Sequence, residues 1–384
     1  MENLRVLIYV QHLLGVGHQR RAAAITRAMV DAGLEVAYVS GGTAVPDLDV
    51  GGAAFAQLPP CKAADSSFRL VDAETGDAID EAWKERRRAC LLDIFAGFRP
   101  SVIVLEMYPF GRRAFRFELE PLLEAAASCA RRPRIVSSVR DVLVEKKDHR
   151  KLEDTVAAIR RWFDLVLVHG DADFIAFDAT FPLAPKIASR LCYTGYVCAG
   201  AAAERGGDFQ RGDILVSAGG GRVGERLLAT AIAARAFSRQ RVATWRLLVG
   251  HGMAEDRFTG LVGRAAEGVV VERARTDFPA LLGRCGASVS LAGYNTVAEL
   301  LATGAPSVLV PFADGDETEQ ATRAARLAER GLAIVVDEAT LEPGALARAV
   351  DAAVTLGRRG LPDIRLDGAR ETARIVSRLA AGVV

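Results

Sequence analysis

The chain has 384 residues, of which 50% are hydrophobic and 25% are charged, and its formal net charge is +1. This length exceeds what one hydrophobic core usually supports, so we expect two domains. The near-zero charge gives no overall electrostatic case for binding nucleic acid, and no apolar run is long enough to cross a bilayer. The six cysteines lack the spacing of a zinc site or a disulfide framework, which fits a cytoplasmic protein.

Short runs rich in Val, Ile and Leu alternate with longer segments of helical spacing in the first half of the chain. The first run is far too short for a signal peptide. These runs lack strict alternation, which favours parallel strands buried on both faces. We expect strands at 4–10, 34–40, 102–106, 135–139, 165–169 and 190–194. Together they predict an α/β domain over residues 1–198.

Small, flexible and polar residues at 199–212 predict a linker, after which the pattern starts again. Strands are then expected at 213–217, 244–249, 268–271, 287–291, 307–310 and 333–336. Residues 213–365 would form the second domain, and we expect the last helix, within 366–384, to pack back on the first. The predicted fold is α/β, with two doubly wound Rossmann-like domains that face each other across a ligand-binding cleft.

A Gly-Val-Gly-His turn at 15–18 follows the first strand and precedes a helix. Its glycines would let the backbone approach a ligand, so Gly17 is a candidate contact. His18 titrates near neutrality and is a candidate general base, although it could instead only cap the helix. Glu106 ends a buried strand and Asp141 follows another, so either carboxylate could orient His18 or act as the base itself.

Three consecutive glycines, Gly219, Gly220 and Gly221, occupy the matching position in the second domain. The sequence is not a Walker A loop, and the glycine spacing of dinucleotide folds is imperfect. Glycines after a strand usually indicate that something approaches the backbone closely. We expect a phosphate or sugar contact here, with a plain tight turn as the alternative.

The segment 287–321 carries the strongest functional signal. A buried strand leads into a turn at Gly293, and a helix is expected to open at Asn295 or Thr296. Unpaired backbone N–H groups and the positive end of the helix dipole would then point at one place, which suits a pyrophosphate. Gly293, Tyr294, Asn295 and Thr296 are the candidate donor contacts.

Glu299 has two competing interpretations. Thr296-x-x-Glu299 has the form of a capping box, which would make the carboxylate structural. Alternatively, a carboxylate one turn inside a phosphate-binding helix can accept both hydroxyls of a ribose. The two interpretations stay open at this point.

An acidic loop at 314–317 follows the next strand and contains Asp-x-Asp, a pattern that can hold a divalent metal. The helix N-terminus already supplies positive charge, so we expect no metal. We favour hydrogen bonds from Asp316, Glu317 and Gln320 to sugar hydroxyls, with a solvated acidic helix start as the alternative. In the first domain, 108–117 mixes aromatic and arginine residues, which could meet an anionic or lipid-linked acceptor or form a solvated helix face.

The motifs of the second half resemble the C-terminal domain of the MurG-like enzymes of glycosyltransferase family 28, which have the two-domain GT-B fold. The matching pieces are Gly219–Gly221, 292–300, Gly304-Ala305-Pro306 and 311–320. In that family the domain holds a UDP-sugar. The resemblance implies that Glu299 binds the ribose and that Gln320 meets the sugar.

The first half is similar to the same family through Gly15-x-Gly17-His18-x-x-Arg21, although the family's longer glycine run is absent. This spacing also resembles the related UDP-sugar hydrolase of pseudaminic acid synthesis, in which the loop histidine is catalytic. Residues 105–111 and 139–141 resemble a branch of predicted MurG-like glycosyltransferases over nearly the full length.

We therefore expect an inverting, metal-independent glycosyltransferase that moves a sugar, with N-acetylglucosamine as a candidate, from a UDP-sugar to an acceptor hydroxyl. No cofactor is expected beyond this co-substrate. The alternatives are a UDP-sugar hydrolase, a UDP-sugar 2-epimerase and a non-catalytic nucleotide-sugar-binding protein. The sequence leaves open the acceptor, the oligomeric state and peripheral contact with the inner face of the membrane.

Overall fold

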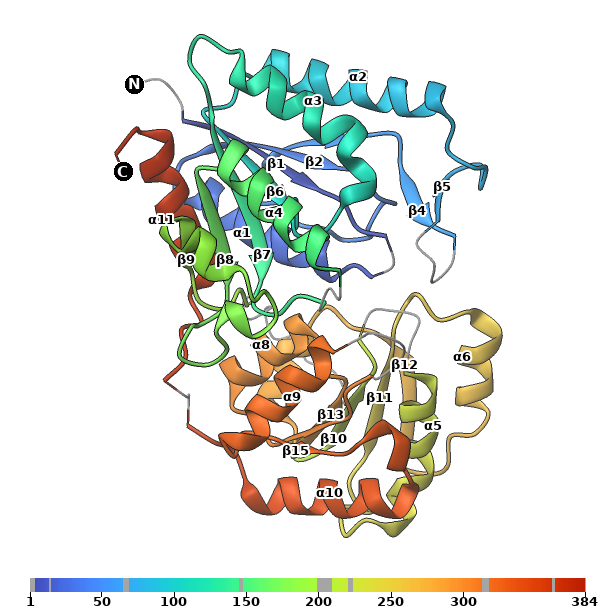
Figure 1. Cartoon of the computed structure of the whole chain (residues 1–384). Helices are drawn as coiled ribbons and strands as arrows, with labels where there is room; N and C mark the ends of the chain where they lie inside the picture. The colour runs from blue at the N-terminus through green and yellow to red at the C-terminus, as the bar shows by residue number, and fades with distance from the viewer. Residues whose placement is uncertain are drawn as a thin grey trace. The chain divides into compact units, whose positions relative to one another are not determined.

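The structure is a computed structural model that describes residues 4–13, 15–64, 69–144, 148–198, 209–219, 224–312, 318–360 and 363–383. The chain divides into two compact units. The first unit comprises 1–172, 176–197 and 367–384, and the second comprises 173–175 and 198–366. The predicted linker at 199–212 lies mostly outside the described residues. Figure 1 shows the elements of both units, coloured from blue at the N-terminus to red at the C-terminus.

The first unit is built on a seven-stranded parallel sheet with the order β3-β2-β1-β6-β7-β8-β9. The strands are β1 (Arg5–Val10), β2 (Glu35–Ser40), β3 (Ala54–Gln57), β6 (Val102–Glu106), β7 (Arg134–Arg140), β8 (Leu165–His169) and β9 (Leu191–Tyr193). The strand order changes direction between β1 and β6. In open α/β sheets, ligands bind beyond the carboxyl ends of the strands at such a switch point.

Helices cover both faces of this sheet, so its strands are buried on both sides. Along β1, Leu7 and Tyr9 join the core cluster that also holds side chains of α2, α3 and α4, whereas Val6 and Ile8 join the cluster of α1 and α11. The helices are α1 (Gly17–Asp31), α2 (Glu81–Phe98), α3 (Arg116–Ala127), α4 (His149–Trp162) and α11 (Gly368–Ala380), with 3-10 turns η1 (Arg113–Phe115), η2 (Phe177–Ala179) and η3 (Ala184–Arg190).

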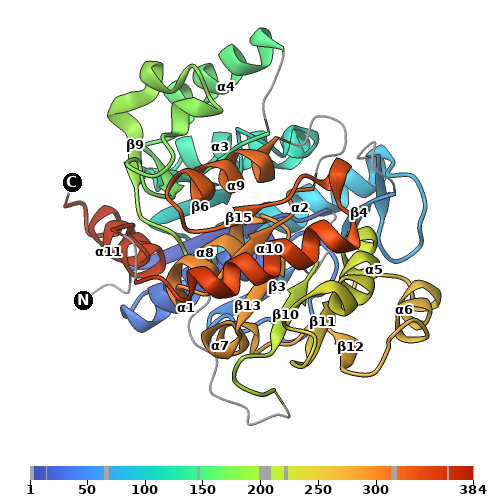
Figure 2. The same cartoon turned by 90° about the horizontal axis from the view of Figure 1, so that it is seen from below.

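The last helix belongs to the first unit. Helix α11 packs against α1, and Figures 1 and 2 both show the two helices side by side. Val197 forms a β-bridge with Asp367, and the N–H of Gly368 donates to Tyr196 O at 3.0 Å. A side chain at Gly368 would lie 2.3 Å from Gly195 O, so only glycine fits at this close approach.

The second unit is built on a six-stranded parallel sheet with the order β12-β11-β10-β13-β14-β15. The strands are β10 (Ile214–Ser217), β11 (Trp245–Val249), β12 (Val269–Arg273), β13 (Ala287–Ser290), β14 (Ser307–Leu309) and β15 (Ile334–Val335). This sheet has its switch point between β10 and β13. The turns at Gly219 and Gly293 follow these two neighbouring strands.

Helices α5 and α10 pack on this sheet and share a core cluster with β10, β11, β13 and β14. Helices α7 and α8 contact each other, and α9 contacts β15. The helices are α5 (Glu225–Ala234), α6 (Glu255–Val262), α7 (Phe278–Arg284), α8 (Tyr294–Thr303), α9 (Glu319–Glu329) and α10 (Pro343–Leu356), with 3-10 turns η4 (Arg235–Phe237) and η5 (Glu338–Thr340).

All the strands expected from the sequence are present, with ends that differ by a residue or two. The sequence did not predict β3 or the antiparallel hairpin of β4 (Cys61–Ala63) and β5 (Leu70–Asp72). Strand β3 is a largely exposed edge strand, and each hairpin strand has only three residues. Such segments carry too few buried positions for an apolar pattern to show.

Candidate functional site

His18 lies in the first turn of α1, directly after β1. Helix α1 starts at Gly17 with Val16 as its N-cap residue, and no side chain caps it. The alternative in which His18 only caps the helix is therefore wrong. Instead, His18 Nδ1 lies 2.7 Å from Glu106 Oε1 at the end of β6. The two residues flank the switch point of the first sheet.

Glu106 is held by two further cationic side chains. Arg21, one turn after His18 on α1, donates from Nη2 to Glu106 Oε1. Arg112 Nη2 lies 4.0 Å from Glu106 Oε2. The Glu106 side chain is fully buried, whereas that of His18 is 18% exposed. Because Nδ1 faces the carboxylate, Nε2 is the ring nitrogen left for a substrate.

Electrostatics favour neutral His18 beside ionised Glu106. Burial lowers the pKa of His18 below its usual value, and Arg112 also lowers it, against the opposing effect of Glu106. Burial alone would raise the pKa of Glu106, but His18, Arg21 and Arg112 outweigh burial and hold that pKa below its usual range. A neutral imidazole that is hydrogen-bonded to a carboxylate is the form needed for a general base.

Asp141 is the other carboxylate predicted to assist His18, but its hydrogen bonds are to other residues. Its carboxylate accepts from the Tyr196 hydroxyl at 2.7 Å and from the N–H of Val142 at 2.8 Å. Asp141 is fully buried. Of the two carboxylates, Glu106 is the one that contacts His18.

The aromatic and arginine residues of 108–117 do not share one surface, and the predicted contact of this segment with an acceptor stays a prediction. Tyr108, Phe110 and Phe115 are buried in the core of the first unit. Arg113 donates to Lys151 O and Thr155 Oγ1, so it binds helix α4. Arg112 is turned toward Glu106, and sequence reasoning did not single it out.

The buried His12 and His169 and the partly exposed His18 make the stability of the first unit depend on pH. Burial lowers the pKa of His12 to about 4 and that of His169 to about 3, and it also lowers the pKa of His18. In the unfolded chain these histidines have the ordinary pKa of about 6.5. Just below that pH, the unfolded state therefore binds protons that the folded state does not bind. The stabilisation is present above that pH and is lost as pH falls toward the folded values, by about 1.4 kcal/mol per pH unit for each histidine.

We therefore expect the urea midpoint of the full chain to drop between pH 7.5 and pH 5.5. His169→Gln should flatten this dependence, because a glutamine side chain takes up no proton. His149→Gln on the exposed start of α4 should leave it unchanged. Equal slopes for the wild type and His169→Gln would contradict the assignment.

In the second unit, α8 begins at Tyr294 with Gly293 as its N-cap residue. Gly293 makes no side-chain cap hydrogen bond, and the first turn of the helix carries no acidic residue. Within the described residues, nothing lies within 4 Å of the position of a Gly293 side chain, and the helix dipole and N-terminal N–H groups at this end suit an anion.

The helix start decides between the two interpretations of Glu299. Thr296 lies inside the first turn rather than at the N-cap, so it cannot form a capping box with Glu299. Glu299 follows one turn later and is half-buried. The capping-box interpretation is wrong, and a ligand role for Glu299 remains a proposal.

The other predicted donor residues fall into two groups. Gly219 adopts a positive φ of 73° after β10, and its N–H donates to Ser217 Oγ at 3.2 Å. Gln320 Oε1 accepts from the N–H groups of Ala292 and Phe312 at 3.1 and 3.2 Å, so it joins the loops after β13 and β14. The predicted contacts that lie outside the described residues are Gly220, Gly221, Asp316 and Glu317.

Residues 265–363 match the glycosyltransferase family 28 C-terminal domain. The second unit carries this family 28 domain. This match spans α8, its N-terminal turn and Gln320. The resemblance to MurG-like glycosyltransferases drawn from the sequence is thereby confirmed.

Relatives of known activity show the same similarity over part of the chain. The UDP-N-acetylglucosamine–N-acetylmuramyl-(pentapeptide) pyrophosphoryl-undecaprenol N-acetylglucosamine transferase of Gloeobacter violaceus is 39% identical over 25% of this chain and 29% of its own length. The enzyme of the same name from Rhodopseudomonas palustris strain BisA53 is 29% identical over 51% of this chain and 56% of its own length. The chain thus matches about half, or less, of each relative.

Solved structures match the full length at low identity. MurG of Acinetobacter baumannii has a TM-score of 0.56 at 13% identity and covers 99% of each chain. A UDP-glucosyltransferase of Polygonum tinctorium has a TM-score of 0.63 at 14% identity and also covers 99% of each chain. These similarities confirm the predicted GT-B fold.

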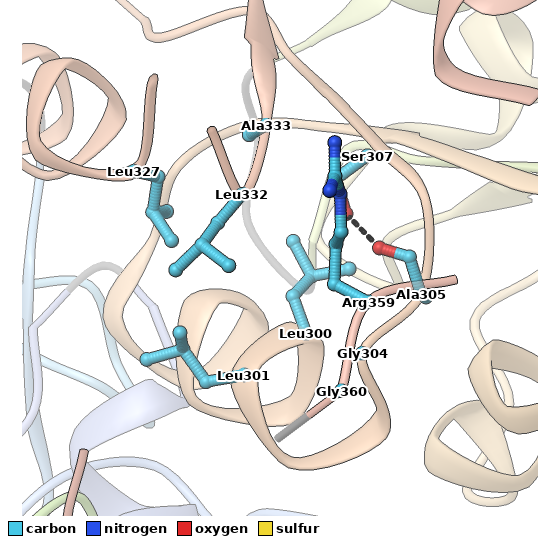
Figure 3. A pocket seen from close by; sticks show the side chains of 10 residues that line it. All are labelled: Leu300, Leu301, Gly304, Ala305, Ser307, Leu327, Leu332, Ala333, Arg359 and Gly360. Atoms are coloured by element: carbon cyan, nitrogen blue, oxygen red, sulfur yellow. Dashed lines mark hydrogen bonds between the residues drawn. The ribbon is translucent and has the colours of Figure 1, made fainter. Parts of the chain in front are cut away.

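A pocket of about 330 Å³, part of it open to solvent, lies at the other end of α8 in the family 28 domain. Figure 3 shows its mainly aliphatic lining, with Leu300 and Leu301 from α8, and Arg359 beside them. None of the predicted donor residues lines it. The pocket is therefore distinct from the N-terminus of α8.

The described residues offer neither a metal-binding cluster nor a membrane-spanning helix. They contain no cluster of three or more His, Cys, Asp or Glu side chains that could hold a metal ion. Within the same residues, no helix combines the length and apolar character that a membrane span requires. The Asp-x-Asp motif lies in the undescribed part, so the metal-free site stays a prediction.

Proposed function

We propose that the protein is a glycosyltransferase that moves a sugar from a UDP-sugar to an acceptor hydroxyl. The observation that carries this proposal is the N-terminus of α8 within a family 28 domain, where the N-cap residue is Gly293 and the first turn carries no acidic side chain. N-acetylglucosamine is the first sugar to test, because the named relatives transfer it. A thermal-shift screen of nucleoside diphosphate sugars tests the donor, and the expected result is stabilisation by UDP and UDP-sugars alone.

In this proposal the diphosphate lies at the N-terminus of α8, against Gly293, Tyr294, Asn295 and Thr296. Glu299 takes the ribose hydroxyls, and the glycines after β10 approach the donor. Gln320 meets the sugar together with Asp316 and Glu317. Because Oε1 of Gln320 already accepts two backbone N–H groups, its Nε2 amide is the atom available to donate to a sugar hydroxyl.

His18 acts as the general base in the proposed reaction. Its Nε2 removes the proton of the acceptor hydroxyl while the oxygen attacks the anomeric carbon and UDP departs from the opposite face, which inverts that carbon. Ionised Glu106 stabilises the imidazolium that forms, since their atoms lie 2.7 Å apart. The N-terminus of α8 stabilises the charge on UDP, so the scheme needs no metal.

Hydrolysis is the second candidate, because the His18–Glu106 pair could activate water as well as a hydroxyl. Incubation with a UDP-sugar and no acceptor separates these outcomes. Rapid stoichiometric release of UDP would support the hydrolase. An isomeric UDP-sugar without UDP release would indicate an epimerase, and donor binding without turnover on a broad acceptor panel would indicate a non-catalytic binder.

We place the reaction in the cytoplasm, where UDP-sugars are made, with an acceptor that is free or held at the inner face of the membrane. Fractionation of cells that express the full chain tests this placement. Recovery with the cytoplasmic fraction, or with membranes released by high salt, would support it. Recovery from the periplasm would contradict it.

Glu299→Ala is expected to raise the Michaelis constant for the UDP-sugar about 10-fold, because the ribose loses a charge-assisted hydrogen-bond partner. The melting temperature should stay close to that of the wild type, since Thr296 is not the N-cap residue and Glu299 is therefore not part of a capping box. Glu329→Ala, on the exposed side of α9, is the matched control and should change neither quantity. Loss of stability with an unchanged Michaelis constant would contradict a ribose role.

A further inference from the structure

Arg112 is a mostly buried cation whose hydrogen-bonding capacity is largely unused. Its side chain is 13% exposed, and its Nε donates to Gln11 O at 2.7 Å. Within the described part of the chain, Nη1 and Nη2 donate no hydrogen bond, and the nearest carboxylate oxygen is 4.0 Å away. A guanidinium offers five donors, and since Nη1 and Nη2 of Arg112 are not among the fully buried atoms without a partner, these donors are accessible to a ligand.

The carboxylate nearest Arg112 is already engaged by other partners. Glu106 Oε1 faces both His18 and Arg21, and two guanidinium groups share this single carboxylate. Tyr9 and Cys61, which also act on Arg112 electrostatically, stay neutral, because burial raises the pKa of each. Glu106 is thus shared by His18 and two guanidinium groups, and it forms no close ion pair with Arg112, whose Nη2 stays 4.0 Å from Oε2.

The backbone of Arg112 is also held in an unfavourable conformation. Its φ of 59° lies in the left-handed region, which a residue with a side chain seldom adopts. The preceding turn is closed by the N–H of Gly111, which donates to Met107 O at 2.7 Å. Such a conformation persists only where surrounding contacts hold it, and the hydrogen bond from Arg112 Nε to Gln11 O is one such contact.

From this geometry we infer that Arg112 binds an anionic group, a phosphate or a carboxylate, on the acceptor next to the hydroxyl that receives the sugar. The inference rests on the proposed function and assigns the acceptor class. Two parallel N–H donors of a guanidinium match two oxygens of such an anion. Bound there, the anion would also offset the charge of Arg112, which otherwise weakens His18 as a base.

Binding is measured by calorimetry on the full chain, saturated with UDP so that the donor phosphate site is filled. Phenyl phosphate and benzoate are the charged probes, and benzamide is the neutral one. The wild type should bind the charged probes at least about 10-fold more tightly than benzamide. Arg112→Gln should lose this preference, whereas Arg113→Gln, at the neighbouring residue that serves α4, should keep it.

Kinetics then separate recognition from a structural role. With matched acceptors such as 4-hydroxybenzoate and 4-hydroxybenzamide, Arg112→Gln should lower kcat/KM for the anionic acceptor about 10-fold and spare the neutral one. Arg112→Lys, which keeps the charge, should retain part of the preference. Equal loss for both acceptors, or charged-probe binding that survives Arg112→Gln, would overturn the inference.

The outcome is distinguishable from failure of the proposed function. If UDP itself does not bind, the donor proposal fails, and the same probes are then titrated without UDP. If the charged probes then bind the wild type but not Arg112→Gln, an anion site in the first unit is still supported. If the substitution leaves probe binding unchanged, the inference fails together with the donor proposal. Equal binding of phenyl phosphate and benzoate would show that the site accepts either anion. Tighter binding of one probe would identify that anion as the group on the acceptor.

Discussion

His18→Ala is expected to lower kcat by about 10²- to 10⁴-fold, because the acceptor hydroxyl loses its general base. The affinity for UDP should be unchanged, since the donor contacts are proposed in the second unit. Steady-state kinetics and calorimetry with UDP measure the two quantities. His149→Ala, at the start of α4, is the matched control. A variant with weaker UDP binding and unchanged kcat would contradict the role of His18.

The partner of His18 can be tested with charge-neutral replacements. Glu106→Gln keeps the shape of the side chain but removes the charge that raises the pKa of His18. The imidazole should become a weaker base, so kcat should fall and the acid limb of the pH profile should move to lower pH. Asp141→Asn should have little effect on this limb, because Asp141 contacts Tyr196. A larger effect of Asp141→Asn would reverse the assignment.

Arg87→Met is expected to destabilise the first unit by about 3–5 kcal/mol, because it leaves the charge of Glu118 buried and unpaired. Both side chains are fully buried, and Arg87 Nε donates to Glu118 Oε2 at 2.6 Å. Arg87 also donates to Gly41 O and Pro59 O at 2.7 and 2.6 Å, so these carbonyls lose partners too. Urea unfolding followed by circular dichroism measures the loss.

Two further variants identify the cause of that loss. Arg88→Met changes the next residue, a surface side chain that pairs with Glu85, and should cost less than about 1 kcal/mol. Adding Glu118→Leu to Arg87→Met should recover part of the stability, because it removes the unpaired carboxylate. A double variant less stable than Arg87→Met would show that the carboxylate is not the source of the loss.

The sheet strands were readable from the sequence because both sheets are parallel and buried on both faces. Their strands therefore appear as continuous apolar runs, such as the five buried residues of β6. Strand β3 could not be read in this way, since Ala54, Phe55 and Gln57 are exposed. The hairpin of β4 and β5 pairs only three residues with three, which is too short for a period of alternating residues to be recognised in the sequence.

The contact between His18 and Glu106 could be predicted, because both residues follow strands at the switch point of the first sheet. His18 and Glu106 follow from that rule, since strand ends that are neighbours in the sheet bring distant residues together. The prediction of a capping box at Thr296 was wrong, because the N-cap residue is Gly293, and glycine can occupy this position without a side-chain hydrogen bond. Arg21 could have been found, since it lies three residues after His18 on the same helix face. Arg112 could not, because its direction depends on the turn at 107–112.

The return of α11 to α1 has a consequence for biosynthesis. Ala373, Val376 and Leu379 fill the core beside α1, yet they are translated only after residues 198–366 of the second unit. The amino-terminal unit must therefore wait, with part of its apolar surface uncovered, while the entire inserted unit is translated. Nascent chains stalled before residue 367 should accordingly recruit chaperones until the carboxyl-terminal segment emerges.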